Sequence, residues 1–429
     1  MTPSASLVIT PRSSLRGAVR VPGDKSISHR AALLGGLAAG TTTVEGFLRG
    51  EDCLATLACL RAMGVRVDDD GSRLVIHGGT LAEADDVLDV GNSGTTIRLL
   101  SGILAGQPFH SVVTGDASIR RRPMDRIATP LRRMGARISG RSGGRLAPLS
   151  IDGGGLRGIA YETPVASAQI KSAVLLAGLF ADGETEVREP SQSRDHTERM
   201  LGAFGVPVRR DGLAVRVSGP AALRGTALRV PGDLSSAAFL LVAAALVPGS
   251  EVTVEDVGLN PTRTGVLDVL TQMGADVRVR GQRDEGGEPV GAVTVRAARL
   301  RGVTIGGALI PRAIDELPVI AVAACLAEGE TVIRDAAELR VKEVDRIAAL
   351  ARELGRLGAE VEPRPDGLAI TGVARLRGGR VASGGDHRIA MAMAVAGLCA
   401  DGPVTIDDPA CIQTSFPEFE ETLRGVTGA

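Results

Sequence analysis

Apolar residues recur along the chain in a pattern that predicts one supersecondary unit repeated six times. Each copy starts with an apolar run long enough for a buried helix, passes through a short break containing glycine, and ends in a strand-like run. The breaks recur at intervals of 66 to 80 residues. The copies begin at Ser28, Gly94, Ser167, Ser235, Glu316 and His387, and their breaks contain Gly40, Gly106, Gly183, Gly249, Gly329 and Gly402.

A second pattern follows each apolar helix: an amphipathic helix that ends in glycine, then a short strand. A glycine at this point suits the left-handed conformation that closes many helices. The pattern therefore predicts that each unit consists of a helix, a strand, a second helix and a second strand, with further strands such as residues 72–78 and 213–219. The closing glycines are Gly64, Gly135, Gly205, Gly274 and Gly358, with a clipped copy at Gly425.

Two copies share their entry turn, which suggests how the units are grouped. VPGDKSIS begins at Val21 and VPGDLSSA begins at Val230. A chain of 429 residues is also too long for one ordinary core. We therefore expect an α/β fold of two lobes with three units each, one lobe formed by residues 21–235 and the other by residues 1–20 plus 236–429.

Composition limits the classes of function. The hydrophobic content of 44% and the charged content of 23% are those of a globular protein. A net charge of −1 and 2% aromatic residues argue against a nucleic-acid surface. The five cysteines contain no C-x-x-C pair, no signal peptide opens the chain, and the longest apolar run (237–247) is too short for a bilayer. We expect a cytoplasmic monomer without membrane or nucleic-acid partners.

Lysine usage directs attention to one helix start. Only three of the 49 basic residues are lysines, namely Lys25, Lys171 and Lys342. A chain that uses arginine elsewhere has kept lysine where a compact, mobile ammonium is needed, unless codon usage alone makes lysine rare. Lys25 follows a Pro-Gly-Asp turn and begins an apolar helix, and such helix starts bind anions.

Charged and polar residues gather at the other predicted helix starts as well. Helix N-termini from both lobes that meet at a common cleft would attract a substrate with several phosphate or carboxylate groups. The alternatives are ordinary helix caps, a solvated basic turn at 120–122, a helical ion-pair ladder at 342–346, and acidic residues that only complement a helix dipole. The five histidines show no metal-binding spacing. The residues are Ser26, Arg30, Asn92, Gly94, Ser167, Gln169, Asp315, Glu316, Asp386 and Arg388, and the second helices are expected to begin with 120–122, 194–196 and 340–346.

Eight motifs, in this order, resemble the family of 5-enolpyruvylshikimate-3-phosphate synthases (3-phosphoshikimate 1-carboxyvinyltransferases) over essentially the whole chain. The resemblance implies a two-lobe, sixfold inside-out α/β barrel. It also implies transfer of the enolpyruvyl group of phosphoenolpyruvate to the 5-hydroxyl of shikimate 3-phosphate, with release of phosphate, on the route to chorismate and the aromatic amino acids, without cofactor or metal. The motifs are VPGDKSISHR, DVGNSGTTIR, RRP, ASAQIKSA, SRDHTERM, IDELP, ELRVKEVDR and GDHR.

The resemblance also implies residue roles, carried over position by position. Asp315 is expected to be the general base and Glu343 the general acid, with Lys25 assisting. The residues expected to bind phosphoenolpyruvate are Lys25, Asn92, Gly94, Arg122, Gln169, Arg346 and Arg388. Those expected to bind shikimate 3-phosphate are Lys25, Ser26, Arg30, Ser167, Ala168, Gln169, Arg194, Asp315 and Lys342.

The sequence departs from the family pattern at three positions. Thr414 stands where many members have a lysine that contacts phosphoenolpyruvate, and Glu338 and Ala168 replace an Asn and a Ser found in some relatives. In the family, a glycine at the position of Gly94 usually accompanies sensitivity to glyphosate, which mimics phosphoenolpyruvate. We therefore expect competitive inhibition by glyphosate.

Two other functions remain as alternatives. The sister enolpyruvyl transferase that acts on UDP-N-acetylglucosamine usually has a reactive cysteine in the loop before its arginine-proline pair. Here that loop reads GDASIRRRP, with Ala117 near the expected place. A phosphometabolite-binding protein without catalysis would lack the acid and base carboxylates, whereas Asp315 and Glu343 are present.

Overall fold

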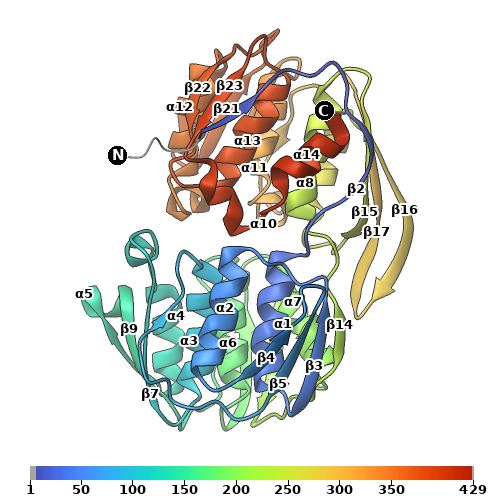
Figure 1. The fold of residues 1–429 in the computed structure, drawn as a ribbon. Helices are drawn as coiled ribbons and strands as arrows, with labels where there is room; N and C mark the ends of the chain where they lie inside the picture. The colour runs from blue at the N-terminus through green and yellow to red at the C-terminus, as the bar shows by residue number, and fades with distance from the viewer. Residues whose placement is uncertain (1–5, 428–429) are drawn as a thin grey trace. The chain divides into compact units, whose positions relative to one another are not determined.

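The structure is a computed structural model that describes residues 6–427 (Figure 1). The chain divides into two compact units. Unit 1 comprises the N-terminal segment up to Pro22, Pro231–Asp284, and the chain from Glu288 onward; unit 2 comprises Gly23–Val230 and Glu285–Gly287. These divisions lie two and five residues from the lobe boundaries expected at 20/21 and 235/236. The assignment of 285–287 to unit 2 has no counterpart in that expectation.

Unit 2 contains three four-stranded sheets with one common topology. In each sheet the first strand is parallel to the second, and the second is antiparallel to the third. The sheets are, in spatial order, β14 (Ala227–Arg229), β3 (Gly40–Glu45), β5 (Arg73–Gly78) and β4 (Arg66–Asp69); β6 (Leu88–Asp89), β7 (His110–Thr114), β9 (Leu146–Asp152) and β8 (Arg137–Gly140); and β10 (Ala160–Glu162), β11 (Gly183–Arg188), β13 (Ala214–Gly219) and β12 (Arg209–Asp211).

Unit 1 repeats this topology, with one sheet reduced to three strands among the residues that the structure describes. Its N-terminal strands pair with strands from much later in the chain. The sheets are β2 (Arg16–Arg20), β15 (Glu251–Gly258), β17 (Glu288–Arg296) and β16 (Asp276–Glu285); β18 (Thr304–Ile305), β19 (Glu330–Ile333), β21 (Gly367–Thr371) and β20 (Glu360–Arg364); and β22 (Gly379–Ala382), β23 (Val404–Asp407) and β1 (Ser6–Ile9).

The apolar helices form the core of each unit, and the sheets and amphipathic helices surround them. Every residue of α11 and α13, and all of α8 up to Ala245, is buried. The sixfold α/β prediction is therefore confirmed. The apolar helices are α1 (Lys25–Leu37), α3 (Gly94–Ala105), α6 (Ala168–Gly178), α8 (Leu234–Leu246), α11 (Leu317–Cys325) and α13 (His387–Leu398). The second helices are α2 (Glu51–Ala62), α4 (Asp125–Met134), α7 (His196–Ala203), α9 (Gly265–Gln272), α12 (Arg346–Arg356) and α14 (Phe419–Thr427), and two short helices are α5 (Arg141–Gly144) and α10 (Leu309–Ala313).

Five of the six glycines expected to close the second helices adopt positive φ, from 83° at Gly358 to 119° at Gly135. The sixth expectation, at Gly425, is wrong, because this residue lies inside α14. Inside this helix Gly425 needs no left-handed turn. The edge of the last sheet is instead formed by β1, which pairs antiparallel with β23.

Two of the second helices begin later than expected. The chain forms 3-10 turns at Ile119–Arg121 and Ala337–Val341, and α4 and α12 start only at Asp125 and Arg346. Before α4 the reason is Pro123, which disfavours a helical conformation in the preceding residue; Arg122 is extended, with φ −74° and ψ 141°. Because Lys342 and Glu343 precede α12, residues 342–346 form no helical ladder; the Glu343–Arg346 ion pair is present, but it is buried rather than on the surface.

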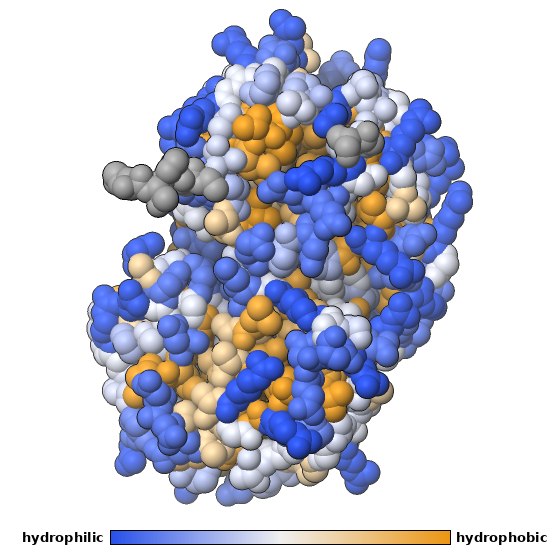
Figure 2. Space-filling model, in the orientation of Figure 1, coloured by the Kyte–Doolittle hydropathy of each residue, from blue (hydrophilic) through white to orange (hydrophobic). Residues whose placement is uncertain are grey.

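Few large apolar side chains are exposed among residues 6–427. On the face drawn in Figure 2, hydrophilic side chains alternate with smaller apolar areas on each unit. The exposed large apolar side chains are scattered in the sequence, as in ordinary globular surfaces. None of the helices in the described part of the chain combines the length and apolar character needed to cross a membrane.

Candidate active site

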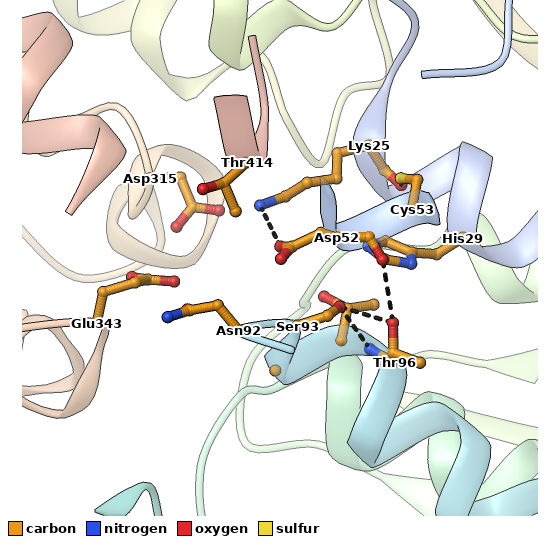
Figure 3. Close-up of polar contacts among 12 residues, drawn as sticks. Lys25, His29, Asp52, Cys53, Asn92, Ser93, Thr96, Asp315, Glu343 and Thr414 are labelled. Atoms are coloured by element: carbon orange, nitrogen blue, oxygen red, sulfur yellow. Dashed lines mark hydrogen bonds and ion pairs between the residues drawn. The ribbon is translucent and has the colours of Figure 1, made fainter. Parts of the chain in front are cut away.

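In unit 2, Lys25 is fixed at the first position of α1. The Asp24 side chain caps this helix by accepting a hydrogen bond from the Ile27 amide at 2.9 Å. The Lys25 ammonium lies 3.1 Å from Oδ2 of Asp52, in the first turn of α2 (Figure 3). Only 16% and 7% of the two side chains are exposed. The ammonium is therefore held beside a carboxylate in a site largely shielded from water.

Arg30 lies one turn further along α1 and is 3% exposed. Its guanidinium donates to Oγ1 of Thr197 at 2.6 Å, to Oγ of Ser172 at 2.7 Å, and to the carbonyl oxygen of Ser26 at 2.9 Å. These partners lie on α7, α6 and α1. Arg30 therefore connects three helices, and through Ser26 it also fixes the backbone at the start of α1.

The segment around Gly94 brings polar groups to the start of α3. Nη2 of Arg122 donates to Oδ1 of Asn92 at 2.7 Å, and Nδ2 of Asn92 donates to Asp116 at 2.7 Å. A Cβ atom at Gly94 would lie 2.8 Å from a guanidinium nitrogen of Arg122 and 2.8 Å from one of Arg98. Arg122 is 7% exposed, so it is not part of a solvated basic turn.

The start of α6 is joined to the start of α3. Oε1 of Gln169 accepts from Arg98 at 2.8 Å, and Nε2 of Gln169 donates to Thr95 at 3.1 Å. Ser167 caps α6, and its own amide donates to Glu189 at 3.2 Å. Ala168 is the first residue of α6, and Arg194 lies half-buried in the loop before α7.

Lys171 has a different role from the one its rarity suggested. Its ammonium is 1% exposed and lies 2.8 Å from Glu189 and 2.8 Å from Glu198. A lysine enclosed by two buried carboxylates is not a mobile charge for a substrate. The expectation that all three lysines were kept for mobility is therefore wrong for Lys171, which joins α6 to the segments that contain the two glutamates.

In unit 1, the guanidinium of Arg346 is the centre of a carboxylate cluster. It lies 2.8 Å from Asp386, 2.8 Å from Glu343 and 3.4 Å from Asp315. The Lys342 ammonium lies 3.5 Å from the same Asp315 oxygen. The proposed base and the proposed acid therefore share one guanidinium.

Burial and neighbouring charges have opposite effects on the pKa of Arg346, whose side chain is 2% exposed. Burial alone would lower the pKa of the guanidinium, but the carboxylates of Asp386, Glu343 and Asp315 raise it above its ordinary value. Asp386 also caps α13 by accepting from the Arg388 amide at 2.8 Å. The Arg388 guanidinium is 6.0 Å from the ring centroid of Phe239, in cation–π range.

Sequence reasoning missed two acidic partners, Asp52 of Lys25 and Asp116 of Asn92. Asp386 was named at a helix start, but its pairing with Arg346 was not expected. A Glu51-Asp52 pair at a helix start signals only a complement to the helix dipole. The hydroxyl of Thr414, which stands where many family members have a lysine, donates to the carbonyl of Cys411. Among residues 6–427, no three His, Cys, Asp or Glu side chains are arranged to hold a metal ion.

The chain is similar to known proteins over nearly its full length. Residues 9–423 match the family described as EPSP synthase (3-phosphoshikimate 1-carboxyvinyltransferase). The 3-phosphoshikimate 1-carboxyvinyltransferase of Desulforudis audaxviator is 59% identical over 425 residues, which cover 98% of this chain and 99% of that protein. The corresponding protein of Geobacillus kaustophilus is 58% identical over 419 residues, or 96% and 98% of the two chains. A solved EPSP synthase structure from Acinetobacter baumannii superposes with a TM-score of 0.87 at 47% identity, covering 98% of each chain.

Proposed function

Because the chain belongs to the EPSP synthase family, we propose that it is a transferase that catalyses the 3-phosphoshikimate 1-carboxyvinyltransferase reaction of the shikimate pathway. The enolpyruvyl group of phosphoenolpyruvate is transferred to the 5-hydroxyl of shikimate 3-phosphate, and phosphate is released. The observation that carries the proposal is the cluster in which Asp315 and Glu343 share the guanidinium of Arg346. An acid, a base and an anion-binding group are the parts that this reaction requires.

Phosphoenolpyruvate binding is assigned to four cations, Lys25, Arg122, Arg346 and Arg388. Arginine suits this task because its planar fork matches carboxylate and phosphate oxygens in bidentate fashion. Asn92 and Gly94 support it, since Asn92 orients Arg122 and Gly94 leaves room for two guanidinium groups.

Shikimate 3-phosphate binding is assigned chiefly to polar groups at the starts of α1 and α6. Gln169 and Ser167 are held in place by hydrogen bonds within unit 2. Asp315 and Lys342 of unit 1 complete the assignment, with Asp315 directed to the reacting hydroxyl. The other assigned residues are Lys25, Ser26, Arg30, Ala168 and Arg194.

The proposed chemistry is an addition followed by an elimination. Asp315 removes the proton of the 5-hydroxyl as that oxygen bonds to C2 of phosphoenolpyruvate, and Glu343 donates a proton to C3, which becomes a methyl group. The methyl group then returns a proton to Glu343, the bond from C2 to the phosphate oxygen breaks, and the double bond re-forms. The proton taken from the hydroxyl leaves with phosphate. Lys25 stabilises the charge that accumulates on the departing phosphate.

The ion pair between Glu343 and Arg346 affects how Glu343 can act as the general acid. At 2.8 Å the guanidinium holds Glu343 as a carboxylate. A phosphoenolpyruvate anion bound to Arg346 competes with Glu343 for the same guanidinium, which frees Glu343 to take up a proton. Substrate binding and the loading of the acid are therefore coupled in this proposal.

The proposal is tested by phosphate release from phosphoenolpyruvate with the purified full-length chain. Release should require shikimate 3-phosphate, and the product should be 5-enolpyruvylshikimate 3-phosphate by mass and by NMR. UDP-N-acetylglucosamine as the second substrate should release none. Release with the nucleotide sugar, or binding of both metabolites without turnover, would support one of the two alternative functions instead.

Substituting Gly94 by Ala is expected to raise KM for phosphoenolpyruvate about tenfold. The new methyl group would lie 2.8 Å from nitrogens of Arg122 and Arg98, so both guanidinium groups must move. Misplacing a substrate-positioning group by about 1 Å can lower the rate by up to about 10²-fold, so a tenfold change in KM corresponds to a smaller shift. Steady-state kinetics with each substrate varied separately measures it, and KM for shikimate 3-phosphate should change less.

The same variant tests the expectation about glyphosate. Wild type should be inhibited competitively with phosphoenolpyruvate, and the inhibition constant should rise further than KM in Gly94→Ala, because the methyl group also narrows the space for the inhibitor. The matched control is Gly202→Ala, where the structure has open space around the added carbon. Equal inhibition constants in wild type and Gly94→Ala would contradict this expectation.

A further inference from the structure

A buried chain of hydrogen bonds runs beneath the binding residues of unit 2. Nδ1 of His29 lies 2.7 Å from Oγ1 of Thr56, which lies 2.7 Å from Oγ1 of Thr96. The Thr96 hydroxyl donates to Oγ of Ser93 at 2.6 Å (Figure 3). All four side chains have no exposed surface, and the reaction proposed above uses none of them.

The His29 ring is neutral in this setting. Burial, followed by the positive charges of Lys25 and Arg30, keeps its pKa well below the ordinary value. A neutral ring carries one N–H group and one bare nitrogen. Nε2 is buried and has no hydrogen-bond partner among residues 6–427.

The position of the ring proton follows from this contact pattern. A buried N–H group without an acceptor is a rarer and costlier arrangement than a buried lone pair without a donor. The proton therefore belongs on Nδ1, where Thr56 accepts it. Thr56 then donates to Thr96, and Thr96 donates to Ser93, so every link of this hydrogen-bond chain donates in the direction away from His29.

This hydrogen-bond chain joins three helices whose first turns lie at the proposed binding residues or at Asp52. His29 lies on α1, Thr56 on α2, and Thr96 on α3. Both threonine hydroxyls also lie within 3.5 Å of the backbone carbonyl of Asp52, the residue that pairs with Lys25. At its far end, Ser93 caps α3 by accepting from the Thr96 amide at 3.1 Å, directly between Asn92 and Gly94.

We propose that His29 is a positioning residue, which donates from Nδ1 into a one-way chain of hydroxyl groups that fixes the starts of α1, α2 and α3 relative to one another. The chain thereby sets where Lys25, through Asp52, and Asn92, through Ser93, meet phosphoenolpyruvate. This deepens the function proposed above and rests on it for the identity of the ligand. His29 touches no substrate in this proposal.

The direction of the chain is tested by NMR on protein with 15N-labelled histidine. One of the five histidines should show the tautomer protonated at Nδ1 and should keep it between about pH 5.5 and 8.5, where an ordinary histidine titrates. Its signals should be missing from the spectrum of His29→Asn, which assigns them. A tautomer protonated at Nε2, or titration within this range, would overturn the proposal.

The positioning role is tested by two substitutions at His29 with opposite expectations. His29→Asn keeps an N–H donor near the Nδ1 position and should retain KM for phosphoenolpyruvate within about threefold of wild type. His29→Leu removes the donor at similar volume and should raise that KM about tenfold, since Thr56 loses a buried partner. KM for shikimate 3-phosphate should change less. His77→Leu, on a partly exposed strand position of the same unit, is the matched control and should resemble wild type.

A third variant covers the case in which His29→Leu does not fold. Thr96→Val interrupts the chain in the middle without a change in volume, and it should raise KM for phosphoenolpyruvate by a similar factor. If His29→Leu folds, its effect and that of Thr96→Val should not add in the double variant, because both act through one series of hydrogen bonds. Normal KM values in Thr96→Val would overturn the positioning role. Wild-type protein without turnover would contradict the proposed function, while the NMR measurement still tests the chain by itself.

Discussion

Replacing Asp315 by Asn is expected to lower kcat about 10²- to 10⁴-fold, the range typical for loss of a general base. The amide has nearly the same shape but cannot accept the proton of the 5-hydroxyl. It also keeps an oxygen that can accept from Lys342 and Arg346, which lie 3.5 and 3.4 Å from Asp315. Single-turnover measurement of phosphate release reports the chemical step, and calorimetry reports the affinity for shikimate 3-phosphate, which should fall much less.

The control for this variant is Asp335→Asn, the same change at an exposed position of unit 1. Asp335 has φ 63°, a conformation that asparagine tolerates, so its rate should match wild type. Near-normal turnover in Asp315→Asn with unaltered binding would show that another group removes the proton.

Replacing Arg346 by Met is expected to lower the free energy of unfolding of unit 1 by about 3–5 kcal/mol, apart from abolishing activity. The change leaves three carboxylates without their shared cation, and the Asp386 side chain has no exposed surface. Removing one partner of a buried ion pair has a cost of this size because the remaining charge stays buried. Urea denaturation of the full chain measures it, with two transitions fitted if the units unfold separately.

Arg380→Met provides the comparison, since it removes an arginine with an equally short ion pair in a solvated place. Arg380 lies 2.7 Å from Asp407, but its side chain is 70% exposed. Exposed pairs contribute little, so the unfolding midpoint should barely move. If both variants lost the same stability, the cluster around Arg346 would not be the buried charge centre described above.

Much of the fold is predictable from the sequence because its signals are local. The apolar runs define the buried helices, and the glycines after the amphipathic helices mark left-handed turns, as Gly64 and Gly135 show with φ of 85° and 119°. Where the local context changes, the same signal fails. Gly425, in the clipped sixth copy, lies inside α14 and closes no helix.

The cations of the site and the two carboxylates assigned by resemblance are predictable, but most of the ion pairing is not. Lys25 is indicated by rarity and by resemblance, but its acidic partner Asp52 lies 27 residues away along the chain and resembles an ordinary acidic residue at a helix start. Asp386 is noticeable at a helix start, but its pairing with Arg346, 40 residues away, leaves no periodic trace in the sequence. Lys171 shows the converse error, because rarity cannot distinguish a substrate-binding ammonium from one enclosed by Glu189 and Glu198.

The pairing of β2 with β15 and of β1 with β23 has a consequence for biosynthesis. Apart from the three residues at 285–287, unit 2 is one uninterrupted stretch inserted into unit 1. Because β1 and β2 precede unit 2 in the chain and their partner strands follow it, both are translated well before they can pair. Their edges stay unpaired during that interval, and unpaired strand edges are where misassembly begins.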